Sequence, residues 1–167
     1  MDRLTTIETA LRDVLLTIDK TVTTANGYTY YNTVTVVNID DEAMADEFGS
    51  YPMLTIYLNP DERINSGNQG AFMNTAYMDI KCKVINDASV VNPRFQINQK
   101  LNTILSDIKE KLSAEYHLNG TVDLVTILSS RRQYLNMGEE YRAGDLFVSI
   151  KIDYTQRRLN PDQTTCI

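Results

Sequence analysis

The sequence predicts an α+β domain with two layers, in which two helices pack on one face of an about five-stranded, mostly antiparallel sheet. Two segments carry apolar residues at helical spacing, and five are rich in β-branched or alternating apolar residues. Their order along the chain is helix, three strands, helix, two strands. Residues 1–160 are expected to form this single domain, and residues 161–167 a polar C-terminal tail.

Each predicted helix shows a stripe of apolar residues spaced three, four and seven positions apart. The first helix covers residues 4–18, and the second begins at Pro93, because proline is tolerated at the first helical position. Asn119-Gly120 is expected to end the second helix. The stripes, which belong against a sheet, are Leu4, Ile7, Leu11, Val14, Leu15 and Ile18, then Ile97, Leu101, Ile104, Leu105, Ile108 and Leu112.

Strands are predicted where β-branched residues gather or where apolar and polar residues alternate. The third strand alternates most clearly, since Met78, Ile80, Cys82 and Val84 interleave with Asp79, Lys81 and Lys83. This pattern is typical of a sheet with one buried face and one solvated face. The five strands are expected near residues 33–38, 53–58, 76–85, 121–130 and 146–154.

Two long polar connections interrupt these strands. Residues 59–70 are interpreted as a long hairpin tip and residues 131–144 as a second long connection, partly strand at its ends. Loops of this length are usually functional or mobile. A further set of apolar residues is predicted on the face of the sheet opposite the main apolar rows, where either a wrapped loop or a subunit interface would cover it. This set is Tyr57, Phe147, Val125 and Ile127.

Catalytic and metal-binding motifs are missing from the sequence. His117 is the only histidine and is interpreted as a helix-end residue favoured by the helix dipole. The acidic stretch 40–47 lacks the ligand order of an EF-hand and is interpreted as a solvated loop, and the G-x-x-G sequence at 67–70 as a turn. We therefore expect no catalytic residue, no cofactor and no bound metal.

Charge and apolar content restrict the partners and the compartment. Sixteen basic and 22 acidic residues give a formal charge of −6, which disfavours a protein that reads nucleic-acid sequence. No apolar run is long enough to span a membrane, and the N-terminus does not resemble a signal peptide. Cys82 and Cys166 are expected to be free thiols in a reducing compartment.

Taken together, the chain resembles the tail terminator proteins of tailed bacteriophages. The resemblance covers nearly all 167 residues and consists of a short amphipathic helix, strands separated by a long hairpin arm, a mid-chain helix, and a last strand over 145–154 before a polar tail. It implies a non-enzymatic virion protein of the tail and neck, present in the host cytoplasm during assembly. Such a protein forms a hexameric ring that caps the tail tube, halts tube growth and joins the tube to the head.

The resemblance also implies partners and contact residues. The partners would be copies of the chain, the tail tube protein, neck or connector proteins and, in a contractile tail, the sheath protein. In this family the hairpin arm reaches an adjacent subunit or the tube, a role that would fall to Arg63, Ile64, Asn65 and Asn68. The remaining candidate interface residues are Tyr57, Phe147, Arg131 and Arg132.

Simple geometry is compatible with a ring of six. A globule of 167 residues has a diameter of about 40 Å, and six in contact leave a hole of roughly 35–40 Å. Duplex DNA, about 20 Å wide, would pass through this hole without sequence-specific binding, because an acidic lumen offers few contacts to phosphates. Two alternatives remain open: another neck or connector component, and a small α+β enzyme or ligand-binding domain, which would need a pocket with convergent polar groups.

Overall fold

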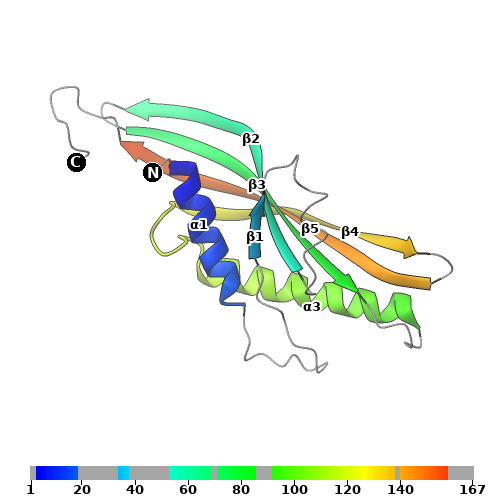
Figure 1. Ribbon diagram of the computed structural model, residues 1–167. Helices are drawn as coiled ribbons and strands as arrows, with labels where there is room; N and C mark the ends of the chain where they lie inside the picture. Colours follow the sequence, from blue (N-terminus) through cyan, green and yellow to red (C-terminus); the bar gives the residue numbers. More distant parts are fainter. Residues whose placement is uncertain are drawn as a thin grey trace.

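The computed structural model describes residues 3–18, 34–37, 53–68, 71–85, 92–137 and 140–157. This part of the chain has an α+β fold with two helices and a sheet (Figure 1). The helices are α1 (Arg3–Leu16) and α3 (Pro93–Ala114). The strands are β1 (Val34–Val37), β2 (Met53–Asn68), β3 (Ala71–Ile85), β4 (Leu124–Met137) and β5 (Glu140–Arg157).

The sheet is built around four long antiparallel strands in the order β2-β3-β5-β4. The short strand β1 adds to the β2 side and runs parallel to β2, pairing Val34 with Leu54 and Val37 with Tyr57. The prediction of an α+β fold is therefore confirmed. The antiparallel part has four strands rather than about five, because β1 pairs in parallel.

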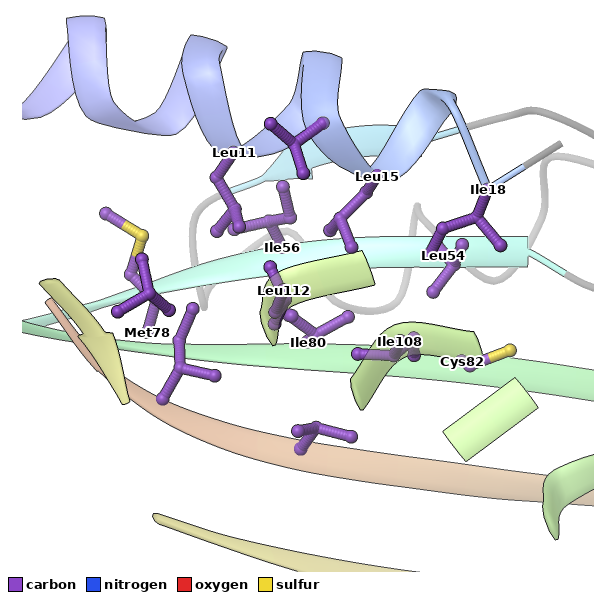
Figure 2. Packing of buried hydrophobic residues seen from close by; sticks show 14 of the residues in the cluster. Leu11, Leu15, Ile18, Leu54, Ile56, Met78, Ile80, Cys82, Ile108 and Leu112 are labelled. Atoms are coloured by element: carbon purple, nitrogen blue, oxygen red, sulfur yellow. The ribbon is translucent and has the colours of Figure 1, made fainter. Parts of the chain in front are cut away.

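One hydrophobic core joins both helices to the sheet. The register places Ile56 of β2, Ile80 of β3 and Val148 of β5 side by side, and all three are fully buried. Figure 2 shows Leu11 and Leu15 of α1 pointing toward this row. The same core holds the stripe of α3, namely Ile97, Leu101, Ile104, Leu105, Ile108 and Leu112. The helical stripes and the alternation in β3 were thus predicted correctly.

Residues 59–70 do not form the predicted long loop. β2 continues through Asn68, and β3 begins at Ala71, five residues earlier than expected. Two irregularities accommodate the polar sequence: residues 60–62 stand opposite one residue of β3, and Asn65 is an extra residue between paired positions. A bulge of this kind tolerates a proline, which cannot donate a ladder hydrogen bond. The extended segment beyond Asn59 and its β3 partner is called the arm.

Residues 131–144 likewise belong almost entirely to strands. β4 runs to Met137 and β5 starts at Glu140, so the predicted connection is a hairpin. The prediction that Val125 and Ile127 lie on the face away from the helices is also wrong. They pair with Ile152 and Ile150 of β5, on the core side, because Leu128 is an extra residue that reverses the alternation of β4.

The segment between α3 and β4 turns sharply at the predicted Asn119-Gly120, but this pair does not end the helix, because α3 already ends at Ala114. Asn119 and Gly120 both have positive φ angles, 55° and 80°, a conformation that asparagine and glycine adopt at low cost. Leu118, also at positive φ, is fully buried and anchors the turn to the core. The strand that follows begins at Leu124 rather than near residue 121.

Several sequence-based expectations lie outside the described residues. These are the solvated acidic loop at 40–47, the free thiol of Cys166 and the polar tail at 161–167. No helix in the described ranges is both long enough and apolar enough to cross a membrane.

Candidate interaction surface

The face of the sheet turned away from the core, here called the outer face, carries the side chains that alternate with the buried row. The strand register aligns one set of these residues across four strands. Lys81 of β3 lies opposite Thr55 of β2 and Phe147 of β5, and Phe147 lies opposite Arg131 of β4. Of this row, Arg131 is exposed and Phe147 is partly exposed, whereas Lys81 and Thr55 are buried.

Lys81 and Asp145 form a buried ion pair on the outer face. The distance from Lys81 Nζ to Asp145 Oδ2 is 3.6 Å, and each side chain is only 6% exposed. The sequence had predicted that Lys81 is solvated with the other charged residues of its strand, and this is wrong. Alternation gives the side of the sheet on which a residue lies, but not whether that side is covered.

Phe147 lies between two cations. The Nζ of Lys81 is 5.6 Å from the ring centroid, and the Cζ of Arg131 is 4.6 Å from it. Both distances fall within the range of an attractive cation–π contact. Arg131 is nevertheless exposed, so its guanidinium is oriented by the ring while remaining available to an anion.

Further along the outer face, polar side chains bind one another. Thr75 donates a hydrogen bond of 2.7 Å to Asp153 Oδ1, and Lys151 Nζ lies 2.8 Å from Asp153 Oδ2. The hydrogen bond with Asp153, together with its negative charge, raises the pKa of Lys151 above its ordinary value. Ser149 donates to Asp79 in the same region. The Thr75–Asp153 and Ser149–Asp79 contacts join β3 to β5, whereas Lys151 and Asp153 lie on the same strand.

The predicted interface residues fall in two separate places. Arg63, Ile64, Asn65 and Asn68 lie on the arm of β2, whereas Arg131 and Arg132 lie on β4, at the opposite side of the sheet. Phe147 joins the β4 group through its contact with Arg131. Tyr57 is 5% exposed, so it offers almost no surface to a partner.

Sequence reasoning missed Lys81 and Asp145 as members of this surface. Their residue types and strand positions gave no signal, because the pair depends on the register of β3 against β5. His117 is exposed beside the ring of Tyr116, as expected of a helix-end residue. Within the ranges that the structure describes, no group of three or more His, Cys, Asp or Glu residues could hold a metal ion.

Comparison with known protein families and with curated proteins finds no match to this chain.

The thiol of Cys82 provides a test of the core beneath this surface. Burial raises the pKa of Cys82 far above its ordinary value of 9.0, and the charge of Asp145 raises it further. The folded protein therefore keeps this proton at a pH where the unfolded chain loses it. Above pH 9 we expect the free energy of unfolding to fall more steeply with pH than in Cys82→Ala, by up to about 1.4 kcal/mol per pH unit.

Denaturant unfolding at pH 8, 9 and 10 measures this difference. The contribution of Cys82 to stability is fully present below the pKa of the unfolded thiol and decreases as the pH rises above it. Equal pH slopes for the wild type and Cys82→Ala would show that the thiol is not enclosed.

Proposed function

We propose that this chain is a structural protein of the tail terminator class, which forms a ring, hexameric by the size argument, that caps a phage tail tube and joins it to the neck. It would reside in the virion tail and, during assembly, in the host cytoplasm. Its partners would be copies of itself, the tail tube protein, neck proteins and, in a contractile tail, the sheath protein. No catalytic role is part of this proposal.

The observation that carries the proposal is the arm. At this end of the sheet, β2, β3 and β5 extend past α1 (Figure 1). The β2 segment from Arg63 to Asn68 pairs with residues 71–75 of β3, and that part of β3 pairs in turn with residues 153–157 of β5. Among the residues of this part of β3 and β5 whose side chains the structure describes, only Tyr154 belongs to the hydrophobic core cluster. A strand extension that adds little to the core is well placed to contact a neighbour.

Exposure at the arm supports the same role. Met73, near the arm tip, is a large apolar side chain that is 55% exposed. An assembled neighbour or a tube end would cover it. The acidic balance of the chain suits a conduit through which DNA slides, because affinity for phosphate comes mainly from lysine and arginine.

Shortening the arm tests the proposal. Ile64 and Asn74 are directly paired, so residues 65–73 can be replaced by an Asn-Gly turn, the preferred two-residue hairpin connection. The shortened variant retains Asn74, so its pairing with Tyr154 of β5 is kept. We expect cooperative unfolding to remain and ring formation, measured by sedimentation velocity, to be lost, together with cosedimentation with polymerised tail tube protein.

The matched control is Gln69→Asn, which introduces the same Asn-Gly dipeptide at the tip while keeping the full arm. It should assemble as the wild type does. If the shortened variant forms rings and caps tubes normally, the assigned role of the arm is wrong. If the wild type neither self-associates nor binds tube ends, the proposed function is wrong.

A further inference from the structure

The outer edge of β4 is exposed along its middle. β4 stands last in the strand order, so one of its two edges pairs with β5 and the other faces away from the sheet. Six consecutive residues, from Leu128 to Gln133, have exposed side chains. An edge strand presents backbone N–H and C=O groups that can pair with another strand. Over six residues this edge is about 20 Å long.

Two arginines flank this edge, one on each face of the sheet. Arg131 lies opposite Phe147 on the outer face, and Arg132 lies opposite Leu146 on the core side. The contact with Phe147 orients Arg131 before any partner arrives, which lowers the entropy lost on binding. A strand added to β4 would therefore lie between two guanidinium groups. Such a site favours a strand that carries carboxylates.

The opposite side of the same sheet provides a matching edge. β1 pairs only with residues 54–57 of β2, and no other strand among the described residues pairs with β2 beyond Tyr57 on that side. This part of β2 carries Asp61 and Glu62 in its sequence. β2 runs antiparallel to β4 within the sheet, because each is connected through antiparallel pairings with β3 and β5.

We infer that the free edge of β4 pairs with the β2 edge beyond Tyr57 of a second copy of this chain. A second copy in the same orientation presents its β2 antiparallel to β4. Because Arg131 is level with Thr55 in the register, the second copy must also be displaced along the strands to bring the part of β2 beyond Tyr57 to residues 128–133. The contact joins two different surfaces, so it repeats from copy to copy and closes into a ring when the rotation permits. The inference rests on the proposed function, which requires copies to contact one another, and it adds the site and the manner of that contact.

Charge reversal at the two arginines tests the inference. Arg131→Glu/Arg132→Glu places two carboxylates at the edge proposed to meet the β2 segment that contains Asp61 and Glu62, and like charges at an interface oppose association. We expect the concentration of half-maximal assembly, measured by sedimentation velocity, to rise roughly tenfold or more. The same concentration should also rise with added salt for the wild type.

The matched control is Arg12→Glu/Lys109→Glu, which changes the net charge equally at exposed positions on the two helices. Its assembly should equal that of the wild type. If the control and the β4 variant lose assembly to the same degree, net charge rather than the β4 edge is responsible, and the inference is overturned.

Hydrogen exchange on the unmodified protein provides a second readout that does not depend on a variant folding. Amides within 128–133 should exchange more slowly in the assembled state than in the dilute monomer, because an added strand bonds their free groups. Rings with unchanged exchange at 128–133 would overturn the inference while leaving the proposed function intact. A chain that stays monomeric and binds no tube would overturn both.

Discussion

Lys81→Met is expected to lower the free energy of unfolding by about 3–5 kcal/mol. The substitution keeps most of the apolar stem but removes the ammonium group that lies 3.6 Å from Asp145, whose side chain is 6% exposed. The free-energy cost of a buried carboxylate that loses its ion-pair partner exceeds the net stabilisation that the intact pair provides. Urea unfolding monitored by circular dichroism measures the loss.

Two further variants separate the ion pair from general damage to β3. Lys83→Met changes the neighbouring lysine of β3, which lies directly opposite Asp145 in the register but is less buried, and it should cost less than Lys81→Met. The double variant Lys81→Met/Asp145→Leu removes both charges and should recover much of the loss. A double variant as unstable as Lys81→Met would show that the isolated carboxylate is not the cause.

The second large effect is expected at Gly144, where β5 passes beneath α3. A Cβ atom at this position would lie 2.6 Å from Cγ2 of Ile97 and 3.1 Å from Cδ1 of Leu101. Ile97 is fully buried, so its Cγ2 would have to shift within the core to make room. Gly144→Ala should therefore lower the free energy of unfolding by about 1–3 kcal/mol through overpacking.

Removing the opposing methyl groups should relieve this clash. Ile97→Ala alone costs about 2–5 kcal/mol because it leaves a cavity. The added cost of Gly144→Ala should be much smaller in that background than in the wild type, since the new methyl group then occupies vacant space. Strictly additive losses in the double-mutant cycle would mean that Gly144 does not contact α3 as described.

The elements with a buried face were predictable, and those without one were not. α3 was predictable because burial of one side of a helix requires apolar residues at helical spacing, as at Ile97 and Leu101. The arm has no comparable pattern, since ladder hydrogen bonds involve only the backbone and accept polar residues. Residues 59–68 and 131–137 were therefore read as connections although the structure pairs them as strands.

The contacts within the candidate interaction surface could not be predicted from any local sequence pattern. Arg131 and Phe147 are 16 positions apart in the chain, and only the register of β4 against β5 brings them into contact. That register includes the extra residue Leu128, which also moved Val125 and Ile127 to the core side. A single unpaired residue in an exposed strand cannot be located from composition or alternation.

The bulge at residues 60–62 can change the direction of the arm without changing which residues form the core. Three residues of β2 face one residue of β3 there, so the bend that they produce lies between the helix-covered body and the projecting tip. Adding or removing one residue at this point would re-aim the tip while the pairing of Ile56 with Ile80 in the core stays unchanged. Changes confined to residues 60–62 could thus direct the same tip toward neighbours of different shape.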